Sequence, residues 1–173
     1  DVIDSTAVDD DLTVTFTGDE EGTLTNGPGN TAFSEIEKLE LGGGDDTVTG
    51  SGGDEHVLTG DGNDVVSAGS GDDTIDGQGG DDTIDGGGYD DSLIGGEGSD
   101  SLVGGSGNDV LIGNNSGVIG VPDADIPLID TPKDQDTNPY DERDTLIGGR
   151  GNDTIDGGDD ADYIDGGADD DLI

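Results

Sequence analysis

The chain has 173 residues, and its 45 acidic side chains against four basic ones give a formal net charge of −41. This charge excludes nucleic acid as a partner, because two polyanions repel each other. With 27% hydrophobic and 3% aromatic residues, burial of apolar side chains alone cannot offset chain entropy and self-repulsion. There is no cysteine, which excludes thiol and disulfide chemistry, and no apolar run is long enough to predict membrane insertion.

Residues 1–40 are predicted to form a β cap at the N-terminal end of the fold. Alternating apolar and polar residues predict strands at 12–17 and 23–25, around a Gly-rich and acidic turn at 18–22. A third strand is predicted over 33–41, which runs straight into the next segment; a helix over 33–41 is the competing interpretation. A cap of this kind shields the first coil of a repetitive fold.

A nine-residue unit, G-G-x-G-x-D-x-U-x with U aliphatic, repeats over 41–113 and again over 144–173. One full example is Gly104-Gly-Ser-Gly-Asn-Asp-Val-Leu-Ile. In all twelve units the sixth position is acidic: Asp46, Glu55, Asp64, Asp73, Asp82, Asp91, Asp100, Asp109, Asp144, Asp153, Asp162 and Asp171. The eighth position is always Val, Ile or Leu: Val48, Val57, Val66, Ile75, Ile84, Leu93, Leu102, Leu111, Leu146, Ile155, Ile164 and Ile173. A random Gly/Asp tract would not fill both columns.

The period disappears over 114–143, where four of the five prolines lie. Because proline cannot donate a hydrogen bond to a strand ladder, this segment is predicted to be an excursion loop. The chain starts without Met and stops midway through a unit, so we expect it to be a segment of a longer protein.

These units predict an all-β fold, a right-handed parallel β-roll with two nonapeptides per coil. The glycines allow sharp turns, and the x-U-x part is a short strand whose U side chain points inward. Coils of eighteen residues stack about 4.8 Å apart, and parallel connections favour the right-handed sense.

Ninth-position side chains, among them Asp76, are expected to face outward. Ile94 and Ile112 should adjoin on one outer face, with Val103 on the opposite one. An exposed aliphatic pair on so polar a surface favours a cover, so the loop residues 118–129 are predicted to fold over it. A bare patch, or one that serves a partner, is the alternative.

Stacking brings the sixth-position carboxylates of neighbouring coils together in rows, which repel each other unless a cation neutralises them. Carboxylates and converging backbone carbonyls offer oxygen ligands in a flexible arrangement. Such ligands suit Ca²⁺ better than octahedral Mg²⁺ or than Zn²⁺, which prefers nitrogen and sulfur. The sequence therefore predicts several bound calcium ions, about seven to nine, and folding that requires them.

The repeats resemble the hemolysin-type calcium-binding repeats of secreted bacterial RTX proteins. The resemblance implies export by a type I system as an unfolded chain, and folding outside the cell, where calcium is millimolar. It also implies that the sixth-position Asp side chains bind calcium: Asp46, Asp64, Asp73, Asp82, Asp91, Asp100, Asp109, Asp153, Asp162 and Asp171.

Some units depart from the pattern. Glu55 replaces the sixth-position Asp, and Tyr89, Asp160 and Asp169 replace the fourth-position glycine. Since Tyr tolerates a left-handed backbone poorly, the turn at Tyr89 is the one expected to deviate most. Asp144 lacks the preceding glycines, so it is expected in an incomplete site.

No catalytic constellation is present, so the chain is not expected to be an enzyme. The one histidine, His56, falls at an outward position, and there is no Cys and no G-x-S-x-G. The loop residues 134–138 open like an EF-hand, but Pro139 stands where that loop needs glycine. We therefore expect a calcium-folded scaffold of a secreted or cell-surface protein. The alternatives are an accessory module of an exported enzyme and a self-associating adhesin or surface-layer element, with other domains, further copies or cell-surface polysaccharide as partners.

Overall fold

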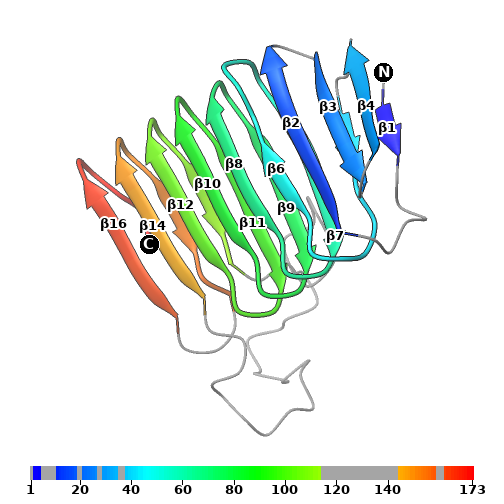
Figure 1. Cartoon of the computed structure of the whole chain (residues 1–173). Coiled ribbons are helices and arrows are strands. Elements are labelled where there is room, and N and C mark those ends of the chain that lie inside the picture. The colour runs from blue at the N-terminus through cyan, green and yellow to red at the C-terminus, as the bar shows by residue number, and fades with distance from the viewer. Residues whose placement is uncertain are drawn as a thin grey trace, which may run out of the picture.

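Two β-sheets, whose strands stack along one axis, make up the body of the protein (Figure 1). The computed structural model describes residues 2–4, 11–18, 21–26, 29–34, 38–113, 144–158 and 162–173. Sheet A contains β1 (Val2–Asp4), β5 (Lys38–Glu40), β7 (His56–Asp61), β9 (Thr74–Gly79), β11 (Ser92–Glu97), β13 (Val110–Ile112) and β15 (Thr154–Asp156). Sheet B contains β2 (Leu12–Gly18), β3 (Glu21–Asn26), β4 (Gly29–Ser34), β6 (Thr47–Thr49), β8 (Val65–Ser70), β10 (Thr83–Gly88), β12 (Ser101–Ser106), β14 (Thr145–Arg150) and β16 (Tyr163–Ala168).

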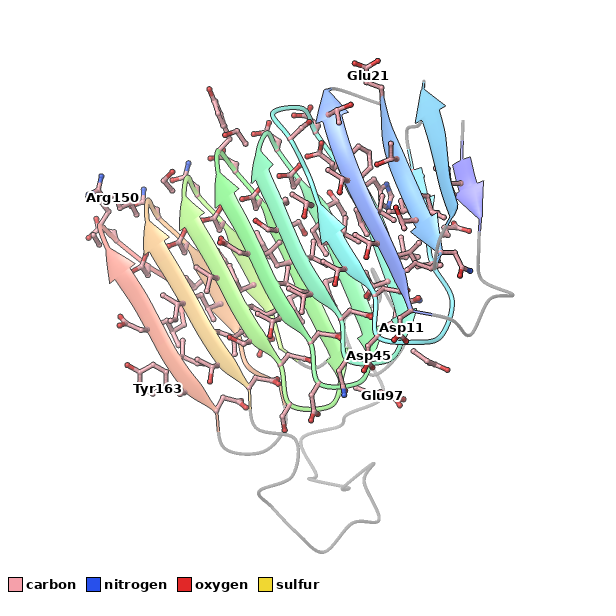
Figure 2. The ribbon with its side chains drawn as sticks, viewed as in Figure 1. Asp11, Glu21, Asp45, Glu97, Arg150 and Tyr163 are labelled. Atoms are coloured by element: carbon pink, nitrogen blue, oxygen red, sulfur yellow. The ribbon has the colours of Figure 1, made fainter. Side chains whose placement is uncertain are left out.

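From β5 onward the chain alternates between the sheets, and each strand pairs in parallel with the strand one coil away. Strand β9 lies between β7 and β11, with Ile75 opposite Val57 and Leu93. Each coil therefore contains two nonapeptides, which confirms the predicted all-β parallel roll. In Figure 2 the turns lie along two long edges, a lower edge near Asp45 and an upper edge near Arg150. In the part of the chain that the structure describes, no helix is long and apolar enough to cross a membrane.

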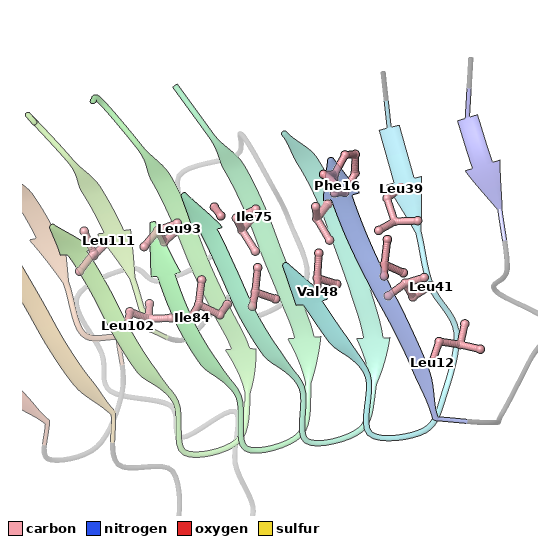
Figure 3. Packing of buried hydrophobic residues seen from close by; sticks show 14 of the residues in the cluster. Leu12, Phe16, Leu39, Leu41, Val48, Ile75, Ile84, Leu93, Leu102 and Leu111 are labelled. Carbon is pink, nitrogen blue, oxygen red and sulfur yellow. The ribbon is translucent and has the colours of Figure 1, made fainter. Parts of the chain in front are cut away.

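The eighth-position side chains fill the space between the sheets and form the core (Figure 3). From Val48 to Ile155 none of them is more than 3% exposed. Val14 and Leu39 extend the same rows toward the N-terminus and are fully buried. Ile164 is partly buried, and Ile173 is 69% exposed. The hydrophobic content is low, but it is concentrated at the eighth position of each unit, which points into the core.

Truncation within this core should destabilise the roll strongly. Leu102 is fully buried between Ile84 and Leu146 of the adjoining coils. We expect Leu102→Ala to lower the free energy of unfolding by about 2–5 kcal/mol, measured by urea titration at saturating calcium. Val110→Ala is the control, because this side chain is 39% exposed, and its effect should stay within about 0.5 kcal/mol. Equal losses in both variants would contradict the assigned core.

The N-terminal strands extend sheet B. Strand β2 pairs in parallel with β6, which places Val14 opposite Val48, and β3 and β4 follow as antiparallel neighbours. The strands predicted at 12–17 and 23–25 are confirmed. The single strand predicted over 33–41 is wrong: β4 ends at Ser34 in sheet B, whereas β5 belongs to sheet A. The range 33–41 is divided between the two sheets because Leu39 lies opposite Val57 of β7, which places β5 in sheet A. The competing helix is also wrong for the described residues of this range.

The roll continues in register across the interruption. Strands β12 and β14 pair with Leu102 opposite Leu146, and β13 and β15 pair in the same way. The predicted placement of Ile94 beside Ile112 is confirmed, with Val103 in the other sheet. The predicted packing of residues 118–129 over this pair, like the EF-hand-like opening at 134–138, lies outside the described residues.

One outward position differs from expectation. Asp76 lies on the outer side of sheet A, between Leu58 and Ile94 of the adjoining coils, and is only 7% exposed. The prediction that this side chain faces solvent is therefore wrong. Burial raises the pKa of Asp76 above its usual value. By contrast, the ninth-position side chain of the next unit, Asp85 in sheet B, is exposed.

Candidate metal centre

The sixth-position acids form two rows inside the turns, one along each edge of the roll. The lower row consists of Asp46, Asp64, Asp82, Asp100, Asp144 and Asp162. The upper row consists of Glu55, Asp73, Asp91, Asp109, Asp153 and Asp171. From Asp46 to Asp153 every one of these side chains is at most 5% exposed. The stacking of carboxylates predicted from the period is thus present in the structure.

One oxygen of each carboxylate belongs to a ladder that connects the coils. Asp82 Oδ1 accepts the backbone N–H of Asp64 at 2.8 Å, and Asp100 Oδ1 accepts that of Asp82 at 2.9 Å. At the start of the lower row, Asp46 Oδ1 accepts the N–H of Leu12 at 2.7 Å, so an apolar residue of β2 takes the place of an acid. These bonds hold each carboxylate in a fixed orientation inside its turn.

The second oxygen has no such partner in several turns. It is buried and makes no hydrogen bond in Glu55 (Oε2) and, as Oδ2, in Asp46, Asp64, Asp73, Asp82, Asp91, Asp109 and Asp153. Burying an unpaired carboxylate oxygen costs roughly several kcal/mol unless a cation or a proton compensates for the lost hydration. Two parallel rows of such oxygens indicate that the turns bind a cation.

The first-position glycines leave space beside these oxygens. A Cβ atom at Gly77 would touch Asp82 Oδ2 and lie 2.6 Å from the carbonyl oxygen of Gly95 in the next coil. At Gly148 the same atom would touch Asp153 Oδ2 and lie 2.5 Å from the carbonyl oxygen of Gly166. A carboxylate oxygen and a backbone carbonyl therefore converge on one space, and oxygen ligands of these two kinds are those that Ca²⁺ prefers.

Comparison with protein families agrees with this geometry. Four copies of a model described as the RTX calcium-binding nonapeptide repeat match residues 33–66, 58–88, 85–116 and 140–173, more than half of the chain. The chain belongs to this RTX repeat family. A search of curated proteins finds no matching relative. Calcium is therefore the cation that the RTX roll is built to bind, and the buried carboxylate rows are where it would be held.

The turn that was expected to deviate most keeps the geometry of the RTX roll. Tyr89 adopts the left-handed backbone, with φ of 83°, and its side chain is 66% exposed. Asp91 in the same turn remains 2% exposed, and its Oδ1 accepts the N–H of Asp73 at 2.9 Å. Asp169 also takes the place of a glycine, with φ of 91°. Asp160 lies outside the described residues.

Glu55 fits into the upper row in a different manner. Its Oε1 accepts hydrogen bonds from the backbone N–H of Ser51 at 3.3 Å and from the Ser51 hydroxyl at 3.2 Å. The additional methylene thus lets the carboxyl group bond within its own turn. Its backbone N–H still donates to Asp73 Oδ1 at 2.7 Å, so the ladder is preserved.

Asp144 is a member of the lower row, but residues 140–143 before it lie outside the described residues, so the incomplete site expected there stays a prediction. Asp144 Oδ1 accepts the N–H of Asp100 at 2.7 Å. Gly113 supplies the first position: a Cβ there would touch Asp144 Oδ2 and lie 2.6 Å from the carbonyl oxygen of Gly157. The segment 114–143 is therefore inserted inside a single turn, between its first and sixth positions.

Burial within the rows raises the pKa values of the carboxyl groups. Burial, with repulsion from Asp100 and Asp64 adding to it, raises the pKa of Asp82 to about 8. Burial, followed by repulsion from Asp73 and Asp109, raises the pKa of Asp91 to about 7. Without a cation, the folded chain therefore holds protons that the unfolded chain releases.

Acid should partly replace calcium. The pKa of Asp82 is higher in the folded chain than its unfolded value of 3.8. The protonated carboxyl group therefore contributes its full stability below pH 3.8, and this contribution is lost as the pH rises through about 8. We expect the circular dichroism β signal of calcium-free protein to grow from pH 8.5 to pH 5. Asp82→Asn, which carries no titratable group at this site, should show a weaker pH dependence. A β signal that grows with rising pH would contradict the assignment.

A second ladder, formed by fifth-position side chains, was not predicted from the sequence. Asp45 Oδ1 accepts the N–H of Asn63 at 2.9 Å, and Asn63 Oδ1 accepts that of Asp81 at 2.9 Å. These bonds run opposite to those of the sixth position, because the acceptor here belongs to the preceding coil. The signal was available, since the fifth position is Asp or Asn in most units. His56, by contrast, is exposed, as expected.

Proposed function

We propose that the RTX roll is a calcium-folded scaffold of a secreted or cell-surface protein, exported unfolded and ordered by calcium outside the cell. The observation that carries this proposal is the pair of buried carboxylate rows, whose second oxygens have no hydrogen-bond partner at eight positions. At a net charge of −41, an unfolded and calcium-free chain is the expected state in a cytoplasm poor in calcium.

Calcium would be held in the turns by sixth-position carboxylates together with backbone carbonyls of the adjoining coils. The ligands proposed from the family resemblance are Asp46, Asp64, Asp73, Asp82, Asp91, Asp100, Asp109, Asp153, Asp162 and Asp171. Bound calcium supplies positive charge between the stacked coils. About seven to nine ions, with dissociation constants of about 10⁻⁴ to 10⁻³ M, suit an extracellular module. As proposed, the roll has no catalytic role, because each coil repeats the same groups.

Equilibrium dialysis against calcium tests the binding. We expect about seven to nine ions per chain at millimolar calcium, and no comparable binding of Mg²⁺, which demands octahedral geometry. Protein that binds no calcium at millimolar concentration would refute the proposed function. Export is tested separately, by antibody detection of the roll in the medium of cells that produce the full-length protein; detection only inside the cells would contradict secretion.

A further inference from the structure

First-position residues differ along the lower edge. Glycine occupies this position in four coils, at Gly77, Gly95, Gly113 and Gly157, whereas the two N-terminal coils carry Leu41 and Thr59. Leu41 belongs to the apolar core. Thr59 is fully buried and polar, whereas the other first positions of the described units carry Leu, Ala or Gly.

The Thr59 side chain occupies the kind of space that glycine leaves open in later coils. At Gly77 that space is bounded by Asp82 Oδ2 and the carbonyl oxygen of Gly95. The equivalent groups around Thr59 are the carboxylate of Asp64 and the carbonyl of Gly77. The Thr59 hydroxyl donates its single proton to that carbonyl at 2.9 Å.

Other substitutions at the first position do not have this effect. Ala68 stands at the first position of the next unit, but its methyl group can neither donate nor accept a hydrogen bond. Thr59 differs because it brings a donor to the carbonyl that would otherwise face a cation. Branching at Cβ also restricts the rotation of the Thr side chain, which keeps the hydroxyl in place.

We propose that the Thr59 hydroxyl takes the place of a calcium ion, so that the turn 59–64 closes without metal while the glycine-first turns of the same edge bind calcium. This inference rests on the proposed function and refines it. Asp64, a calcium ligand by family resemblance, then serves only as an acceptor for the ladder through Oδ1, and the Thr59 side chain fills the space that a cation would otherwise occupy. A cation entering this turn would have to displace a buried side chain and break its 2.9 Å hydrogen bond to Gly77.

Native mass spectrometry of the calcium-saturated chain tests the proposal, because it resolves single bound ions. Thr59→Gly removes the hydroxyl and opens the space, so it should bind one ion more than the wild type. Thr59→Ser keeps the hydroxyl and should bind the wild-type number. Thr59→Val keeps the volume and should also bind the wild-type number. The reciprocal change, Gly95→Thr, should lose one ion.

The outcomes separate this inference from the proposed function. A wild-type chain that binds no calcium refutes the proposed function itself. Calcium binding by the wild type, with an unchanged number in Thr59→Gly, overturns only the role of Thr59. Loss of an ion in Thr59→Val also overturns it, because the hydroxyl would then be a calcium ligand. If Thr59→Gly fails to fold, Gly95→Thr decides: one ion fewer supports the inference, and an unchanged number refutes it.

Discussion

Removal of calcium is expected to unfold the roll completely. In excess chelator the circular dichroism spectrum should be that of a disordered chain, and millimolar calcium should restore the β signal. The reason is the charge of −41 combined with two rows of stacked carboxylates. About seven to nine ions contribute roughly +14 to +18 of charge within those rows, and their binding free energy becomes folding free energy.

Two controls separate coordination from simple screening of charge. Magnesium at the same concentration supplies the same charge but fits the turns poorly, so it should restore little β structure. Sodium chloride at about 1 M shortens the screening length to about 3 Å and should not replace calcium either. A β signal that persists in chelator at neutral pH would show that the roll folds without metal, which contradicts the scaffold mechanism.

Asp82→Ala is expected to damage folding strongly. Asp82 is 2% exposed, and its removal leaves the N–H of Asp64 without an acceptor and deprives the turn of its carboxylate. Breaking a buried charge interaction costs about 3–5 kcal/mol. Spread over the binding of about eight ions, that loss raises the calcium midpoint of folding about two- to threefold.

Asp85→Ala is the matched control, three residues away in the same coil. Its side chain is exposed, so the change should alter the free energy of folding by no more than about 0.5 kcal/mol. Asp76 would be a poor control, because it is 7% exposed despite its outward position. Equal calcium midpoints for the Asp82 and Asp85 variants would mean that bulk charge, and not the turn geometry, controls folding.

Glycine at the first position connects the fold to metal binding. In the glycine-first turns, a carboxylate oxygen and the carbonyl of the next coil converge where a side chain would otherwise lie. The same two groups are separated in an unfolded chain, because they come from different coils. The sites therefore exist only when the coils stack, and the coils stack without repulsion only when the sites are neutralised, which explains why folding and calcium binding are coupled.

The nine-residue period determined the coil, the core and the two carboxylate rows. Each of these depends on spacing alone. The aliphatic residue at the eighth position of each unit, and the acid at its sixth position, recur on the same side of the coil. For this reason the sequence alone predicts the stacking of Asp64 with Asp82 and of Ile75 with Leu93.

Tertiary structure decided the features that depend on neighbours one coil or more away. Asp76 is 7% exposed and lies between Leu58 and Ile94, each eighteen residues distant. Gly113 supplies the first position of the turn of Asp144 across the inserted segment, a pairing that no local pattern indicates. Thr59 fits the repeat as a simple substitution, and only its burial and its hydrogen bond to the next coil distinguish it from the glycines. Periodicity specifies which residues face inward, whereas the groups that each of them meets are set by the stacking of the coils.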